Sequence, residues 1–223
     1  MSEFLPIILL SVQVAAVAVV LDAPTAVILG WLLARKDFPG KSFVNTVLTA
    51  PLVIPPVVTG YFLLVFLGRR GFAGVWLEST LGITLAFTWK AAAIASAVIA
   101  LPLFVRSVQV AIAGVEVKFE DAARVLRQNE WQVFRRITLP LAWHGFVAGA
   151  LLAFARALGE FGATIIFAGN IPGATQTIPL KIFSLINQPG GEQRLWPFLI
   201  ASMALAFVAV LVSEWMVRQK STK

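Results

Sequence analysis

The chain has 223 residues, of which 59% are hydrophobic and 13% are charged, and its formal net charge is +7. Because soluble domains carry about 25% charged residues, this composition excludes an ordinary soluble domain and indicates an integral membrane protein, and the positive charge is typical of cytoplasmic loops rather than of a nucleic-acid-binding surface. The chain has no cysteine and a single histidine, which excludes disulfides, thiolate chemistry and a metal cluster built on these residues.

Five apolar segments are each long enough to cross a bilayer, which takes about 20 helical residues. We expect an all-α integral membrane protein with a single transmembrane domain over residues 1–223 and no soluble domain. The expected spans are residues 10–34, 43–67, 83–105, 141–168 and 195–217.

The first span contains Asp22 and Pro24 near its middle. Because proline removes a helical hydrogen bond and its ring clashes with the preceding turn, we expect a kink there. Asp22 would then bond to Thr25 and cap the helix that follows the kink. Residues 4–9 are expected to form an interfacial segment that leads into this span.

Basic residues indicate the orientation of the spans. Loops 35–42 and 106–140 and the C-terminal residues together hold twelve lysines and arginines, against five on the other side. Because cytoplasmic loops are enriched in these residues, we expect the N-terminus outside, the C-terminus in the cytoplasm and loop 169–194 outside.

Residues 116–140, called here the charged block, are the one long charged stretch of the chain. Its acidic residues Glu120 and Asp121 precede Arg124, an order that the helix dipole favours. Apolar residues recur in it at helical spacing. They are Phe119, Ala122, Ala123 and Leu126.

Further along the charged block, Asn129 and Gln132 have the spacing of a capping box, which predicts a second short helix. This helix would carry Trp131, Phe134 and Ile137. The block is therefore expected to form two short amphipathic helices at the cytoplasmic surface. Such helices could lie on lipid headgroups, form a merely solvated loop, or dock a partner protein.

The fourth span contains two opposite charges, Arg156 and Glu160, one helical turn apart. A charge inside a membrane costs about 3 kcal/mol unless it is paired or faces water, so this pair should face protein or a pore. It would either lock two helices together or lie on the path or gate of an anion. A ridge of small residues in the same span predicts close approach of another helix. The ridge consists of Gly145, Gly149, Ala153 and Ala157.

Other function classes find little support. Residues 39–42, PGKS, resemble the end of a phosphate-binding loop, but Arg35 stands where that motif needs glycine, and no strand precedes it. A membrane-embedded enzyme needs a nucleophile–base pair or a metal cluster, and no such set is evident. A self-contained channel or secondary transporter is disfavoured because no inverted repeat is visible.

The charged block resembles the EAA loop of ABC importer permeases, which forms a coupling helix that fits a cleft in the cytoplasmic ATPase. The pattern runs Asp121-Ala122-Ala123, three residues, position 127, nine residues, Ile137, one residue and Leu139-Pro140. That family usually has glycine at the position of Arg127, where it allows a left-handed turn. We expect Asn129 to take over this turn. The ATPase-coupling residues that the resemblance implies are Glu120, Asp121, Ala122, Ala123, Arg124, Arg127, Asn129, Trp131, Phe134, Ile137, Leu139 and Pro140.

Nearly the whole chain is similar to the molybdate permease subunits of ABC transporters (ModB-like). Residues 51–71, 154–180 and 187–191 carry this resemblance, and sulfate permeases share a looser version of it. It implies a type I ABC importer fold, in the cytoplasmic (inner) membrane of a prokaryote, that moves molybdate or tungstate by alternating access. Sulfate, thiosulfate or another oxyanion is the alternative substrate.

The same resemblance implies the partners. They are a second copy of the chain, a cytoplasmic ATPase dimer that binds ATP and Mg²⁺, a periplasmic oxyanion-binding protein and membrane lipid. The chain itself would bind no cofactor or metal and catalyse no reaction. Asn170, Pro172 and Gly173 of the outer loop would contact the binding protein, and Arg156 and Glu160 would lie on the translocation path or at its gate.

Overall fold

The computed structural model describes residues 3–221, with side chains described as far as Met216. Within this part of the chain every regular element is helical, as expected. The elements are α1 (Phe4–Arg35), α2 (Lys41–Val53), α3 (Pro56–Leu67), α4 (Phe72–Leu81), α5 (Trp89–Ala113), α6 (Val117–Val125), α7 (Glu130–Val133), a π-helical turn (Phe134–Thr138), α8 (Leu139–Leu158), α9 (Gly162–Phe167), α10 (Ile178–Ile186) and α11 (Glu192–Ser221).

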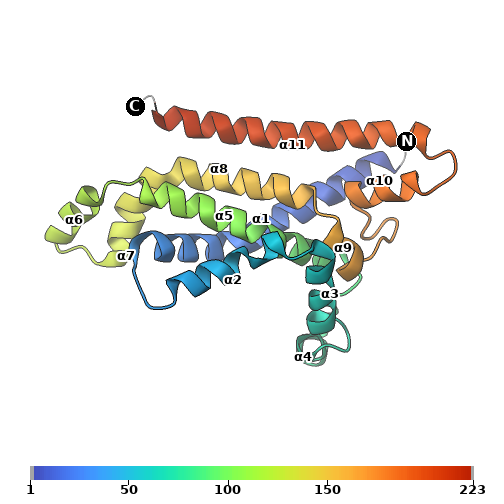
Figure 1. Ribbon diagram of the computed structural model, residues 1–223, viewed down its shortest axis with the longest axis horizontal. Helices are drawn as coiled ribbons and strands as arrows, with labels where there is room; N and C mark the ends of the chain where they lie inside the picture. Colours follow the sequence, from blue (N-terminus) through green and yellow to red (C-terminus); the bar gives the residue numbers. More distant parts are fainter. Residues whose placement is uncertain (1–2, 222–223) are drawn as a thin grey trace.

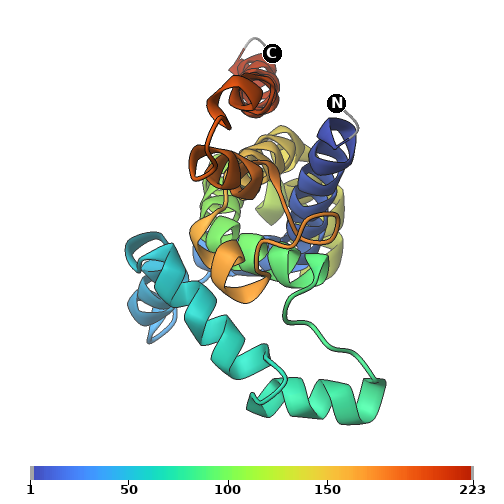
Figure 2. The ribbon, with the colours of Figure 1, turned by 90° about the vertical axis from the view of Figure 1, so that its right-hand side faces the viewer.

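The long helices α1, α5, α8 and α11 run side by side along the length of the molecule (Figure 1). α6 and α7 lie at the end where α1 and α5 finish, and α9 and α10 lie at the opposite end, where α1 and α11 begin. α3 and α4 project from the side of this bundle, as the end view in Figure 2 shows. The charged block therefore lies at the opposite end of the bundle from loop 169–194, which is called the outer loop here because it is expected outside.

The described part of the chain has four candidate membrane spans, or five if a bent pair of helices counts as one, against the five expected. Two of the expected segments differ in shape, and one of these is the span expected over 141–168, because α8 ends at Leu158 and residues 162–167 form the separate helix α9. Four helices are long and apolar enough to cross a membrane: Phe4–Arg35, Trp89–Ala113, Glu130–Leu158 and Glu192–Met216. The remaining segment, expected as one straight span over 43–67, consists of α2 and α3 bent by 108°. Pro55 and Pro56 stand at the bend. Proline lacks an N–H and disfavours the helical conformation of the residue before it, which explains the break.

The expected hydrogen bond between Asp22 and Thr25 is not formed, and no new helix begins after Pro24. α1 continues as one helix from Phe4 through Pro24 to Arg35, and residues 4–9 belong to it rather than to a separate interfacial segment. Asp22 is 6% exposed, and its Oδ2 atom has no hydrogen-bond partner. Loss of a single N–H at Pro24 does not end a 32-residue helix whose neighbouring turns keep their bonds and pack on α5.

α5 lies between α1 and α8 and is the most buried long helix. Small residues allow the close packing on both sides. A Cβ atom added at Gly145 or Gly149 of α8 would lie 2.3 Å from Ala111 Cβ or 2.6 Å from Ser107 Cβ of α5. Ala153 and Ala157 are buried on the same helix. The predicted small-residue ridge is therefore confirmed, and α5 is the helix that it approaches.

Candidate functional site

The charged block forms two short helices at one end of the bundle, as expected. α6, however, buries a carboxylate and exposes its large apolar side chains, which is the reverse of a simple amphipathic helix. Glu120 is 1% exposed and Ala123 is 5% exposed. The apolar residues Phe119, Val125 and Leu126 are instead 46%, 81% and 74% exposed. α6 therefore turns a carboxylate toward the protein and presents an apolar surface outward, which is not the arrangement of a merely solvated loop.

Glu120 is held by partners from two other elements. The Nε atom of Arg35, the last residue of α1, lies 3.0 Å from Glu120 Oε2. The hydroxyl of Thr138 donates to Glu120 Oε1 at 2.7 Å. Arg35 also donates from Nη2 to the carbonyl oxygen of Val115 at 2.8 Å. These bonds satisfy a buried charge and fix α6 to the ends of α1 and α8.

Arg124 joins α6 to α7. Its Nε donates to Glu130 Oε1 at 2.8 Å and its Nη2 to Glu130 Oε2 at 3.2 Å, a two-pronged pair. Its Nη1 donates to Asp121 Oδ1 at 2.7 Å. The bonds to Glu130, and then those to Asp121, raise the pKa of the Arg124 guanidinium. A bidentate pair fixes orientation as well as distance, so the two helices form one unit.

The left-handed turn between α6 and α7 is made by Arg127 itself, with φ of +58°. The expectation that Asn129 takes over this turn is wrong, because Asn129 is extended, with φ of −75° and ψ of 163°. The backbone N–H of Arg127 bonds to Arg124 O and that of Gln128 bonds to Ala123 O, which is the Schellman pattern of a helix end. Arg127 occupies the position that usually holds glycine.

Asn129 has the other role that the sequence predicts. Its Oδ1 accepts from Gln132 N at 2.9 Å, and its own N–H donates to Gln132 Oε1 at 3.0 Å. This is a complete capping box, which starts α7 in the correct direction.

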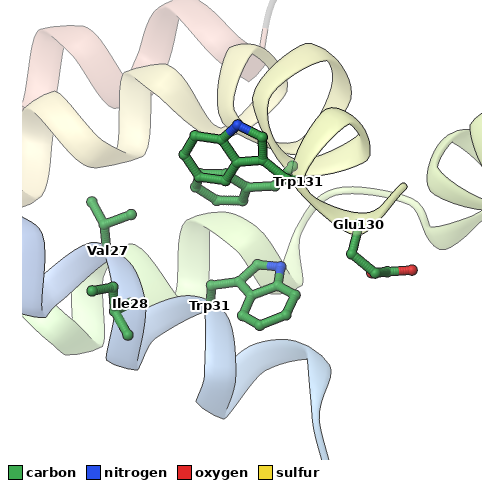
Figure 3. A pocket seen from close by; sticks show the side chains of 6 residues that line it. Val27, Ile28, Trp31, Glu130 and Trp131 are labelled. Carbon is green, nitrogen blue, oxygen red and sulfur yellow. The ribbon is translucent and has the colours of Figure 1, made fainter. Parts of the chain in front are cut away.

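α7 and α1 enclose an apolar groove of about 280 Å³. Figure 3 shows Trp31 of α1 and Trp131 of α7 on opposite sides of it, with the Glu130 carboxylate turned away. Trp131 is 67% exposed, while Phe134 beneath it is 9% exposed, and their rings stack with centroids 5.9 Å apart. Phe134 therefore supports Trp131 from inside and does not itself present a surface to a partner.

The block runs into α8 without a break. The π-helical turn of residues 134–138 lies between α7 and α8, and Leu139 N bonds to Phe134 O. Ile137 and Leu139 are half-buried, and Pro140 is exposed in the first turn of α8. α7, the turn and α8 together form a single helical segment, Glu130–Leu158.

Arg156 and Glu160 form the expected ion pair. Arg156 Nη1 lies 3.0 Å from Glu160 Oε2, and the Glu160 side chain is 2% exposed. Glu160 lies after the end of α8, and its Oε1 accepts from Ala163 N at 2.8 Å. The carboxylate therefore neutralises Arg156 and also caps α9.

The outer loop has a fixed form. Asn170 donates to Ser184 Oγ and accepts from Gln176 Nε2, both at 2.8 Å. Pro172 and Gly173 are exposed at its tip, and Gly173 has φ of +75°. Asn170 therefore holds the loop, while Pro172 and Gly173 are the two of these three residues that a partner can reach.

Sequence reasoning missed two residues of the block's framework, Arg35 and Thr138. Arg35 counted only as one of the basic residues that orient the spans. Its contact with Glu120 spans 85 positions of the chain, so no local spacing reveals it.

The sequence matches the family described as "Binding-protein-dependent transport system inner membrane component" over residues 26–220. It is 51% identical to the "Molybdenum transport system permease protein ModB" of Escherichia coli (strain K12) over 211 residues, which cover 95% of this chain and 92% of that protein. The protein of the same name from Haemophilus influenzae is 45% identical over 96% of this chain and 93% of that protein.

Among solved structures, the chain resembles one titled "Inward facing conformations of the MetNI methionine ABC transporter: CY5 native crystal form". The TM-score is 0.69 at 15% identity, and the match covers 98% of this chain and 94% of that one. At this identity the likeness establishes the fold alone.

Proposed function

The chain belongs to the family of binding-protein-dependent transport system inner membrane components, and on that premise we propose that it is the permease subunit of an ATP-driven importer of molybdate. The observation that carries the substrate is 51% identity, over nearly the full length of both chains, to a relative named as a molybdenum transport permease. The type I ABC transporter fold supports the importer mechanism.

The charged block is proposed as the docking site of a cytoplasmic ATPase, which would bind ATP and Mg²⁺. Its outward residues are large and apolar, and Leu126 and Trp131 are 74% and 67% exposed. Aromatic and aliphatic anchors of this kind fill pockets at the centre of protein interfaces. Glu120 and Ala123 face inward and support the block, while Phe119, Leu126 and Trp131 would enter the partner.

A permease chain has no energy source of its own. Two copies would line an anion path, and closure of the ATPase dimer on ATP would move the two charged blocks as rigid bodies and switch the path between outward and inward access. A periplasmic binding protein would deliver the anion at the opposite end, at Pro172 and Gly173. The apolar outer faces of the long helices would contact lipid.

Docking is tested with Leu126→Asp, which places a charge at the centre of the proposed contact. The permease should remain in the membrane and lose its co-purifying ATPase. Ile186→Asp is the matched control, because Ile186 is 63% exposed but lies in α10 at the other end of the bundle. Retention of a fully active ATPase by Leu126→Asp would exclude this docking surface.

The substrate is tested by uptake into proteoliposomes that contain the permease, its ATPase and its binding protein. Molybdate and tungstate should be taken up, and competition with sulfate should follow the affinities of the binding protein. Both anions are tetrahedral dianions, and separating them would take a desolvated site whose donors fit only one of them. Efficient sulfate uptake without molybdate uptake would favour the alternative substrate.

A further inference from the structure

A groove between α2 and α5 is lined by polar side chains, although both helices belong to membrane segments. Its volume is about 470 Å³. It opens near the end of the bundle that carries the charged block, because α2 begins and α5 ends there. The lining residues are Lys41, Ser42, Asn45, Thr46 and Thr49 of α2 and Arg106 of α5.

α2 has three distinct sides. Leu48 is buried against the bundle, while Phe43 and Val47 are 72% and 54% exposed and suit lipid. The third side carries the polar residues of the groove, at positions i, i+3, i+4 and i+7 from Ser42. Polar side chains at membrane depth face a protein interior or a water-filled cavity rather than lipid. This side of α2 therefore faces protein or an aqueous space, and the groove against α5 is such a space in this chain.

Two cations line this groove, Lys41 and Arg106. Lys41 is paired with Asp37 at 2.8 Å, which leaves Arg106. It lies seven residues, or about 10 Å, before the end of α5. Its Nη1 donates to Gln109 Oε1 at 2.9 Å, which is a neutral partner, and among the described residues no carboxylate forms a salt bridge with it. Arg35 and Arg156, by contrast, are each paired with a buried glutamate. Arg106 is thus an uncompensated cation within a membrane helix.

The rest of the groove leaves donors available. The hydroxyls of Thr46 and Thr49 donate to carbonyl oxygens within α2, so they are not the primary donors for a ligand. The oxygen of the Asn45 side chain is buried without a hydrogen-bond partner. This oxygen is an acceptor, so the NH₂ end of the amide, with its two N–H donors, is the end that would face an anion. A guanidinium from α5 and an amide from α2, on the two sides of the groove, are suited to a tetrahedral oxyanion.

We propose that this groove is the cytoplasmic part of the anion's route and that Arg106 and Asn45 hold a tetrahedral oxyanion there in transit. The inference rests on the proposed function and names the residues that line the path. Arg106 takes the place of Arg156 as the cation that attracts the anion, because Glu160 neutralises Arg156. The same chemistry would suit a lipid phosphate, and the experiments below separate the two sources.

The first experiment uses the absence of cysteine in the chain, which makes single cysteine variants free of background labelling. In inside-out vesicles that hold the full transporter, Thr46→Cys should react with a membrane-impermeant anionic methanethiosulfonate, and molybdate should slow the reaction. Val47→Cys is the matched control, because Val47 is exposed on the adjacent apolar side. Equal reactivity at the two positions would overturn the proposal.

The charge of Arg106 has its own readout. Adding Arg106→Gln to Thr46→Cys should lower the ratio of labelling rates for anionic and cationic reagents by at least about threefold, because a nearby unit charge attracts one and repels the other. If Arg106 instead binds a lipid phosphate, its charge is already neutralised, and the ratio will not change. That outcome would assign Arg106 to the membrane surface and overturn the proposal.

The second experiment measures transport by the reconstituted complex. Arg106→Gln should lower molybdate uptake per ATP by about tenfold, corresponding to loss of roughly one charge-assisted hydrogen bond, while stimulation of the ATPase by the loaded binding protein is retained. Arg106→Lys should keep most of the uptake. Uptake by Arg106→Gln equal to that of the wild type would overturn this inference alone, whereas absence of molybdate uptake by the wild type would overturn the proposed function.

Discussion

Arg35 and Glu120 meet at 3.0 Å across 85 positions of the chain, one at the last residue of α1 and the other on the inner side of α6. Their side chains are 12% and 2% exposed. This contact, with the Thr138 hydroxyl on the same carboxylate, ties the charged block to the bundle and makes the two move together.

Replacement of Glu120 by alanine should therefore destabilise the protein and uncouple it from the ATPase. Removing one partner of a buried ion pair leaves the other uncompensated and costs about 3–5 kcal/mol. Thermal unfolding in detergent and ATPase stimulation by the binding protein measure the two effects. Glu116→Gln is the control, since its pair with Lys118 is exposed and should contribute at most about 1 kcal/mol. Equal effects of the two substitutions would show that burial of Glu120 is unimportant.

Arg127→Gly should stabilise the protein. A non-glycine residue at φ of +58° carries a cost of about 1 kcal/mol, which glycine relieves, and a gain of that size raises Tm by about 2–4 °C in a chain of this length. Asn129→Ala should lower Tm by a similar amount, because the capping box is lost. A lower Tm for Arg127→Gly would mean that the arginine side chain makes contacts worth more than its backbone strain.

Gly145→Ala should loosen the packing of α8 on α5. Its new methyl group would lie 2.3 Å from Ala111 Cβ, and overpacking of this kind costs about 1–3 kcal/mol. Gly159→Ala is the matched control, because its nearest neighbour would be 3.8 Å away and its φ of −85° suits any residue. Unfolding curves of both variants should separate clearly, and coincident curves would contradict close helix contact at Gly145.

The orientation of the chain can be measured with reporters. A fusion after Lys223 should be cytoplasmic and one within loop 169–194 should be periplasmic, because the bundle places the charged block and the outer loop at opposite ends. The side chains of Arg218 and Lys220, and the whole of Lys223, on which part of the expected orientation depends, lie outside the described residues. Reporters on the same side of the membrane would show that the chain does not cross it once between loop 169–194 and Lys223.

Local patterns in the sequence predicted local structure well. The capping box at Asn129 and Gln132 and the pairing of Arg156 with Glu160 depend on residues three or four positions apart, so spacing alone reveals them. The bend between α2 and α3 had a local signal too, in the successive prolines 55 and 56, but the apolar length of 43–67 was given more weight. The membrane segments were found because bilayer thickness sets their length.

Long-range contacts could not be predicted in this way. Glu120 was expected only as a coupling residue, and its burial depends on Arg35 and Thr138, which come from other elements. Arg127 was expected to avoid the left-handed turn because the local cost is unfavourable, yet the bonds at Arg124 and Ala123 hold it there. Arg106 counted only as one more basic residue for orientation, and its lack of an acidic partner became evident only with the helices in place.

The helix α8 has a mechanical consequence. Its 20 residues form a rod about 30 Å long, with the π-helical turn of the charged block at one end and Arg156 near the other. A tilt of such a rod by about 5° around its centre would displace each end by roughly 1.3 Å in opposite directions. A small push on the charged block would thus arrive at the far end of α8 as a displacement of equal size in the opposite direction, with no need for α8 itself to bend.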